Sequence, residues 1–228
     1  MLVIDGRFNG ALTSGNGGYS AGVFSRFVEG LAEVNLRSPV PLDTALEVER
    51  SGVEARILHG DTLVAEVRPA EDIDLDVPRV DPAEARAAAK RYTGTGMEVF
   101  ARCYVCGMER DDSFGVFAGP VDGREAVASP WTPPAWAADG SGHVRPAHVW
   151  GVLDCPTYFA AHLGQEATSS FLVRMSARVD EPVVAGEEHV VVAWPLGGEG
   201  RKREAASAVL APGGDVLAVA RVLLVRAR

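Results

Sequence analysis

The chain has 228 residues, of which 47% are hydrophobic and 23% charged, and its formal net charge at pH 7 is −9. This much apolar sequence can bury a full core, which argues against global disorder. The negative charge argues against sequence-independent nucleic-acid binding, because that binding needs a broad basic surface to displace counterions from the phosphates. We therefore expect a soluble globular protein with no nucleic-acid partner.

The lengths of the apolar runs and the number of cysteines indicate the compartment. Runs such as HVVVAW and VLAVARVLLV fall well short of the roughly 18 residues that a membrane span needs. The opening MLVIDGRFNG lacks the basic region and apolar block of a signal peptide. The 3 cysteines, an odd number, argue against a disulfide framework. The sequence predicts a cytoplasmic protein with no membrane partner.

The first half begins with a glycine-rich segment and continues with strand-like segments. TSGNGGYSAGVFSRFVEG predicts a short helix over about residues 19–29. The stretches AEVNLRSPV, TALEVERSG, VEARILHG and DTLVAEVRPA then predict strands. The HGD at the junction of the last two predicts a hairpin turn, because glycine tolerates positive φ.

A connector follows the first half. AEDIDLDVPRVD is acidic and contains proline, and PAEARAAAKRY predicts a short helix with proline near its start. We expect residues 71–97 to form a linker with a short helix that crosses the surface. This linker separates an N-terminal unit, residues 1–70, from a C-terminal unit, residues 98–228.

The second half repeats the order of the first. HVWGVLDCPTYFAAH predicts a buried helix with Asp154 set in its apolar face. SSFLVRMSARV, EEHVVVAWPL, KREAASAVLAPGG and DVLAVARVLLVRAR predict strands, and GGD matches the earlier HGD turn. One helix followed by an antiparallel meander, repeated once, predicts an α+β fold in which each sheet wraps a helix.

Three segments resemble the hotdog-fold acyl-CoA thioesterases of the phenylacetate-pathway type. CYVCGMERDDSFGVFAGPV resembles the opening of that type, GNGGYSAG the start of its central helix, and WGVLDCP the helical segment that carries its catalytic aspartate. The resemblance implies a double hotdog, in which two antiparallel sheets each wrap a central helix as a pseudo-dimer in one chain. It also implies hydrolysis of an acyl-CoA or acyl-carrier thioester, with coenzyme A as part of the substrate and no further cofactor.

The resemblance also implies which residues the first half contributes. In that family the central helix begins with His-Gly-Gly, and the acid lies eight residues after the first glycine. This half keeps Gly17 and Gly18, with Asn16 in the place of the histidine and Ser25 in the place of the acid. A helix-opening amide can donate to the oxyanion that develops on a thioester carbonyl. The first half thus supplies the donors without the acid.

The second half has the opposite composition. It keeps the acid, Asp154, but Arg145, Pro146 and Ala147 stand where His-Gly-Gly would be. A buried carboxylate can attack a carbonyl directly or activate water. The resemblance therefore implies one composite site per chain, with Asp154 as base or nucleophile and the glycine amides of the first half as oxyanion donors.

Other side chains are expected to contact the substrate. Aromatic and hydroxyl groups on the helices can line an acyl pocket, although packing is the default role for such groups. Basic side chains can contact the phosphates of coenzyme A, with solvated charges as the alternative. The expected residues are Tyr19, Trp150, Thr157 and Tyr158 for the pocket, and Arg174, Arg201, Lys202 and Arg203 for the phosphates.

Several of these motifs have a plainer interpretation. Cys103 and Cys106 have the spacing of a zinc motif, but with no second Cys pair and no His-x-x-x-His we predict a turn with partly buried thiols and no metal. Cys155 has no obvious partner base and is predicted to be core. Asp154 can be a structural acid paired with an arginine. His148 lies off the helical face of Asp154, and a catalytic dyad is not expected.

Two other functions stay open. The replacement of the family histidine by Asn16 favours a non-catalytic acyl-thioester binding protein. A double-hotdog enoyl-CoA hydratase or dehydratase would use a closely spaced Asp and His, which DCPTYFAAH does not offer. The chain can be a monomer or can pair through its outer surfaces into a homodimer of double hotdogs.

Overall fold

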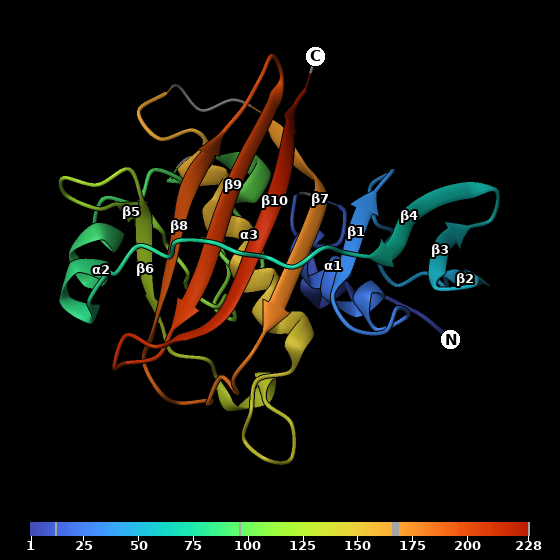
Figure 1. Cartoon of the computed structure of the whole chain (residues 1–228), viewed down its shortest axis with the longest axis horizontal. Coiled ribbons are helices and arrows are strands. Elements are labelled where there is room, and N and C mark those ends of the chain that lie inside the picture. The colour runs from blue at the N-terminus through green and yellow to red at the C-terminus, as the bar shows by residue number, and fades with distance from the viewer. Residues whose placement is uncertain (12, 96, 166–168, 228) are drawn as a thin grey trace.

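Both halves of the chain contribute to one antiparallel sheet in the computed structural model, which describes residues 1–11, 13–95, 97–165 and 169–227. The described strands are β1 (Ala32–Leu36), β2 (Glu47–Ser51), β3 (Glu54–His59), β4 (Thr62–Pro69), β5 (Gly119–Pro120), β6 (Val127–Trp131), β7 (Ser170–Val179), β8 (His189–Gly197), β9 (Lys202–Leu210) and β10 (Val216–Arg226). Their order in the sheet is β2-β3-β4-β1-β7-β10-β9-β8-β6-β5 (Figure 1).

The two predicted sheets join edge to edge into one continuous sheet. Strand β1 of the first half pairs with β7 of the second, and Val34 lies opposite Met175 in this register. Both side chains are fully buried. An unpaired edge exposes a row of backbone hydrogen-bonding groups, and this pairing satisfies two such edges at once. The predicted α+β class is confirmed, with one continuous sheet.

Strand β6 was not predicted from the sequence. Strand β6 contains Pro130, and a proline within a run normally argues against a strand because it cannot donate to the ladder. Here Pro130 pairs only toward β8, opposite Val190. On its other side, β6 pairs with the short β5 only at Val127 and Ala128, so β5 does not reach Pro130. There is therefore no ladder hydrogen bond to β5 for the proline to interrupt.

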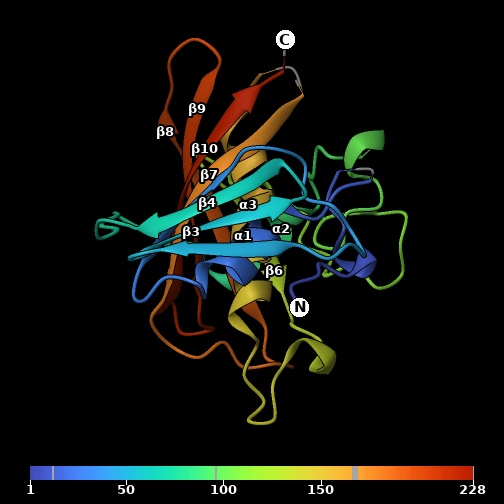
Figure 2. The same ribbon diagram turned by 90° about the vertical axis from the view of Figure 1, so that its right-hand side faces the viewer.

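Helices α1 (Gly17–Ser25) and α3 (Pro146–Ala161) lie together on one side of the sheet (Figure 2). The first has 9 residues and the second 16. They cross at close range, since a Cβ on Gly22 would lie 2.7 Å from Cβ of Trp150 and 2.8 Å from Cα of Ala147. None of the described helices is both long and apolar enough to cross a bilayer.

The connector crosses one face of the sheet and buries some of its side chains against the strands there. Figure 1 shows it running from β4 across strands β10, β9 and β8 to α2 (Pro82–Ala89). Ile73 and Val80 of the connector are buried with Ala85 and Ala88 of α2 against those strands. The connector therefore covers the face of the sheet that α3 leaves open, because an apolar sheet face must be buried against another layer.

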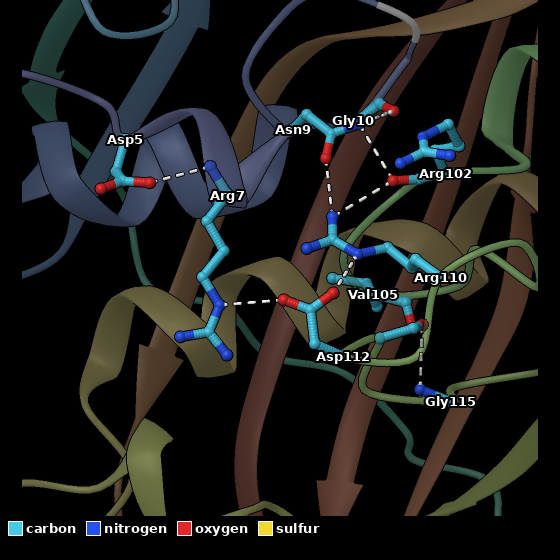
Figure 3. A network of polar contacts seen from close by, with 10 residues as sticks. Asp5, Arg7, Asn9, Gly10, Arg102, Val105, Arg110, Asp112 and Gly115 are labelled. Atoms are coloured by element: carbon cyan, nitrogen blue, oxygen red, sulfur yellow. Dashed lines mark hydrogen bonds and ion pairs between the residues drawn. The ribbon is translucent and has the colours of Figure 1, made fainter.

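A polar network joins the N-terminal segment to the loop that precedes β5 (Figure 3). Arg110 donates to the side chain of Asn9 at 2.7 Å and to the carboxylate of Asp112 at 2.6 Å. Arg7 reaches the other oxygen of Asp112 at 3.1 Å. Asn9 in turn donates to the backbone carbonyl of Arg102 at 3.0 Å. The network holds the residues before α1 against the loop that contains Cys103.

We expect the contribution of Asp112 to stability to disappear in acid. The hydrogen bonds from Arg110, and then from Arg7, lower the pKa of Asp112 from 3.8 to about 2. A carboxyl group with a depressed folded-state pKa stabilises the fold above its unfolded pKa, and this stabilisation is lost as pH falls through the folded pKa. Because the Asp112 side chain is 43% exposed, Asp112→Asn should cost only about 0.2–1 kcal/mol at pH 7.

Thermal unfolding of the wild type and Asp112→Asn, followed by circular dichroism between pH 7 and pH 2, measures this effect. The difference in Tm should be largest near neutral pH and should shrink below about pH 4, where the unfolded-state carboxyl group begins to bind its proton. Asp215→Asn, in the exposed turn between β9 and β10, is the control. An equal difference at every pH would show that the charge of Asp112 does not matter.

Candidate active site

The carboxylate of Asp154 meets the N-terminal end of α1. Its Oδ2 accepts a 2.8 Å hydrogen bond from the backbone N–H of Gly18, 136 residues earlier in the chain. A Cβ on Gly18 would lie 2.4 Å from Cβ of Asp154 and 2.6 Å from the carbonyl oxygen of Trp150. Glycine is therefore required here for the two helices to approach. The fold brings together the acid of the second half and the glycine amides of the first.

Asn16 caps α1 and also contacts two thiols. Its Oδ1 accepts from the N–H of Tyr19 at 2.8 Å, the usual role of an asparagine at a helix N-cap. Its Nδ2 donates to Sγ of Cys155 at 3.5 Å and to Sγ of Cys103 at 3.7 Å. Asn16, which occupies the position of the family histidine, therefore caps the start of the helix and also contacts two surrounding side chains.

The environment of Asp154 favours its neutral form. Burial raises its pKa from 3.8 to about 7, and the Gly18 N–H works in the opposite direction by stabilising the anion. The charge on Cys103 adds to the upward shift. Within the part of the chain that the structure describes, the ion pairs all involve other carboxylates. The alternative of a structural acid paired with an arginine therefore finds no support in the described residues.

A cavity of about 340 Å³ opens beside this contact. The first half contributes residues 14–17 and 36–40 to its wall, and β7 contributes residues 170–173. Asp154, Tyr158 and Phe159 face it from α3. Apart from Asp154 and Arg37, the described lining is uncharged. The arrangement suits an uncharged, largely apolar group placed next to a carboxylate and a helix N-terminus.

The residues predicted to line the pocket separate into two groups. Tyr158 lines the cavity, whereas Tyr19, Trp150 and Thr157 are not among its described lining residues. Thr157 is fully buried and donates to the backbone carbonyl of Asp154 at 2.6 Å. Trp150 packs against α1, and Tyr19 stacks on Phe8 with ring centroids 4.3 Å apart. These three residues lie outside the described lining, and their described contacts are packing and hydrogen-bonding contacts within the protein.

Arg37, which directly follows β1, and Arg174, on the neighbouring strand β7, have different relations to the cavity. Arg174 on β7 is not among the described lining residues, and its Nε lies 3.8 Å from a carboxylate oxygen of Glu33. Arg37, which the sequence reasoning missed, lies at the cavity and forms an ion pair with Glu66 at 2.5 Å. Strand β1 ends at Leu36, and the position of Arg37 directly after this apolar residue was the sequence feature that could have pointed to it.

The basic cluster Arg201–Arg203 lies at the start of β9, away from the described lining of the cavity. The Arg201 side chain donates to the carbonyl of Arg226 at 3.1 Å, and Arg203 donates to the carbonyl of Lys202 at 2.9 Å. Arg226 pairs in turn with Ser170, which lines the cavity. The cluster therefore lies one strand beyond the edge of the cavity, on the same end of the sheet.

Both histidines of α3 have structural surroundings. His148 packs against Tyr19 and other aromatic rings, and burial, reinforced by nearby arginine charge, lowers its pKa to about 4. His162 ends the helix, where its ring nitrogens pair with the carbonyl of Tyr158 at 2.8 Å and the hydroxyl of Ser170 at 3.1 Å. Neither arrangement provides the Asp-His pair that hydratase chemistry would use.

The position equivalent to Asp154 on α1 carries no acid. Ser25, the last residue of α1, donates its hydroxyl back to the carbonyl of Gly22 at 2.9 Å. The N-cap of α3 is Arg145, whose side chain makes no capping bond and instead donates to the carbonyl of Trp136 at 3.0 Å. The described residues therefore form one composite arrangement of acid and glycine amide per chain.

Cys155, which the sequence predicts to be core, is half-buried, packs against the core and also lines the cavity. Its Sγ lies 3.6 Å from Sγ of Cys103, and Cys106 also lines the cavity. The sequence could have pointed to this thiol at the site, because the third cysteine of the chain directly follows Asp154.

Comparison with known proteins identifies the fold. No family model and no curated protein matches the chain. A conserved protein of unknown function with a hot dog fold from Alicyclobacillus acidocaldarius is similar over 98% of this chain and 91% of its own, at 13% identity and a TM-score of 0.59. The tesB protein of Mycobacterium avium subsp. paratuberculosis is similar over 92% of this chain and 85% of its own, at 11% identity and a TM-score of 0.57.

Shorter solved chains also match. The PaaI protein of the E. coli phenylacetic acid degradation operon is similar over 63% of this chain and 96% of its own, at 12% identity and a TM-score of 0.50. The chain spans 62% of the length of a solved thioesterase superfamily protein that it also matches. The predicted hotdog fold is confirmed. The chain is a hotdog-fold protein in which two helix-and-sheet units share one continuous sheet.

Proposed function

We propose that the protein is an acyl-CoA or acyl-carrier thioesterase with one composite site per chain. The observation that carries the proposal is the contact between Asp154 and the N-terminus of α1 at the wall of a largely uncharged cavity. An acyl group fits such a cavity, and its thioester carbonyl can reach a backbone amide and a carboxylate together. The same pairing of helix amide and acid is what the resemblance to hotdog thioesterases implies.

The two glycines are assigned different roles. The N–H of Gly18 already donates to Asp154 and positions the carboxylate. Gly17 is the first residue of α1, so its N–H has no acceptor within the helix, and it lines the cavity. We assign the oxyanion contact to Gly17, where the helix dipole adds to the stabilisation of negative charge. This refines the expectation that both amides serve the oxyanion.

Asp154 supplies the reacting carboxylate. It either attacks the thioester carbon, giving a mixed anhydride that water then hydrolyses, or removes a proton from the attacking water. In both routes the carbon–sulfur bond breaks and coenzyme A leaves as its thiol. The described contacts give the carboxylate one strong hydrogen bond, from Gly18, and little solvent. A poorly solvated carboxylate is a better nucleophile and base than one in bulk water.

The remaining predicted contacts are arranged around this centre. Tyr158 and the rings of Phe100 and Phe159 line the cavity and would contact the acyl group. Arg37 at the cavity, and Arg201, Lys202 and Arg203 on the adjoining end of the sheet, would contact the phosphates. Arg174 is less suited because, unlike Arg37, it is not among the described lining residues of the cavity.

The proposal is tested by measuring free-thiol release from short-chain, long-chain and aromatic acyl-CoAs with the purified full-length protein. Turnover on at least one substrate is expected. The second candidate function, a non-catalytic acyl-thioester binding protein, is favoured by the engagement of the Gly18 amide with Asp154 in place of a substrate oxygen. No turnover on any substrate, together with a tightly bound acyl ligand in the purified protein, would establish that alternative.

A further inference from the structure

All three cysteines of the chain converge on one place. The Sγ atoms of Cys103, Cys106 and Cys155 all lie within 4.8 Å of one another. Two come from the loop before β5 and the third from the middle of α3, 52 residues from Cys103. They line the cavity next to Asp154. Thiols that served only as small core groups would have no reason to gather at the wall of a cavity.

The loop around Cys103 has the geometry of a metal-binding turn. The N–H of Gly107 donates to the carbonyl of Cys103 at 2.8 Å and closes the turn. A Cβ on Gly107 would lie 2.5 Å from the Cys103 carbonyl oxygen, so the turn requires glycine. This C-x-x-C-G turn directs two sulfur atoms to the same side, as in structural zinc sites.

Neighbouring side chains hold the sulfur atoms in place. The Nδ2 of Asn16 donates to both Cys103 and Cys155, at 3.7 Å and 3.5 Å. The hydroxyl of Tyr92 donates to the carbonyl of Cys106 at 3.1 Å. Donors of this kind orient metal ligands. Asn16 therefore has a role in the sulfur cluster beyond capping α1.

We propose that Cys103, Cys106 and Cys155 bind one Zn²⁺ ion, whose fourth coordination position faces the cavity. Tetrahedral coordination with a Zn–S distance of about 2.3 Å places sulfur atoms about 3.8 Å apart. The sulfur atoms of Cys103 and Cys155 lie 3.6 Å apart, and the remaining separations are below 4.8 Å. Side-chain movements of about 1 Å or less therefore form the site.

The number of ligands also fits a zinc site. Binding would release the protons of the three thiols, and three protein ligands with one open position form the pattern of zinc sites that also take water or substrate. The inference reverses the sequence prediction of no metal, which considered Cys103 and Cys106 without Cys155. It does not depend on thioester hydrolysis.

Metal binding is tested on the full-length protein, reduced and stripped of metal. Zn²⁺ titration in competition with a chromophoric chelator should give one ion per chain, and bound Zn²⁺ should protect the three thiols from alkylation. Co²⁺ should give sulfur-to-metal charge-transfer absorption and the visible bands of a four-coordinate site. Cys106→Ser and Cys155→Ser should each weaken Zn²⁺ binding by at least about tenfold, because each removes a thiolate ligand.

Met108→Leu is the matched control, since Met108 is a sulfur-containing residue in the same loop whose sulfur accepts from Thr95. It should leave the affinity and the stoichiometry unchanged. Circular dichroism establishes that each variant is folded, and the thiol protection measured on the wild type stands if one variant does not fold. Three freely reactive thiols in the presence of Zn²⁺, or loss of two thiols to a disulfide in the purified protein, would overturn the proposal.

Discussion

Asp154→Asn is expected to reduce the rate of acyl-CoA hydrolysis by a factor of about 10²–10⁴, the usual contribution of a catalytic acid or base. The substitution keeps the shape of the side chain, and an amide oxygen can still accept the hydrogen bond that Gly18 donates to Asp154. The helix contact should therefore survive while the ability to take a proton or attack carbon is lost. Free-thiol release measures the rate, and calorimetry with the same acyl-CoA measures the affinity, which should stay within about threefold.

Asp215→Asn, in the exposed turn after β9, is the matched control and should hydrolyse acyl-CoA at the wild-type rate. Full activity of Asp154→Asn would show that the carboxylate takes no part in the reaction. The cysteines at the cavity would then be the next candidates. Loss of binding together with loss of turnover would instead mean that Asp154 builds the pocket. The two readouts thus separate the reacting role of the carboxylate from a purely structural one.

Gly18→Ala is expected to destabilise the fold and to abolish hydrolysis. Its new methyl group would lie 2.4 Å from Cβ of Asp154 and 2.6 Å from the carbonyl oxygen of Trp150, so α1 and α3 must move apart. Overpacking of this kind costs about 1–3 kcal/mol, which exceeds the 0.5–1 kcal/mol or so that alanine gains over glycine within a helix. The expected fall in Tm is roughly 2–10 °C for a chain of this size.

Gly140→Ala is the control for this prediction, because nothing lies within 4 Å of a Cβ at that position. Its Tm should change by no more than about 1 °C. Thermal unfolding by circular dichroism gives both values under identical conditions. A Gly18→Ala variant as stable and active as the wild type would show that the two helices tolerate separation and that the contact with Asp154 is dispensable.

The local elements were predictable because their patterns depend on neighbouring residues. The strands after each helix follow runs of β-branched and apolar residues, and the HGD and GGD turns mark the hairpins. Gly60 and Gly214 have φ values of 56° and 92°, the conformation that favours glycine in such turns. The predicted helix at about 19–29 was displaced and begins at Gly17, since Asn16 caps it. Boundaries depend on such caps more than on hydrophobic periodicity.

The placement of the connector and the sheet edges was not predictable in this way. An acidic stretch that contains proline predicts a surface segment, but Ile73 and Val80 within it are buried on the sheet. Likewise, no pattern in the sequence of β1 identifies β7 as the strand with which it pairs. Both outcomes follow from the need to cover an apolar face and to pair an open edge, which is a property of the assembled sheet.

The sequence by itself determined the α+β class, the duplicated helix-and-meander order, and the residue types available for chemistry: one buried acid, a glycine-opened helix and three cysteines. The tertiary structure alone decided which of them meet. The Gly18–Asp154 contact spans 136 residues and the Cys103–Cys155 contact spans 52. Contacts of that separation are set by how helices pack across a sheet and which way side chains point, and no local pattern encodes either.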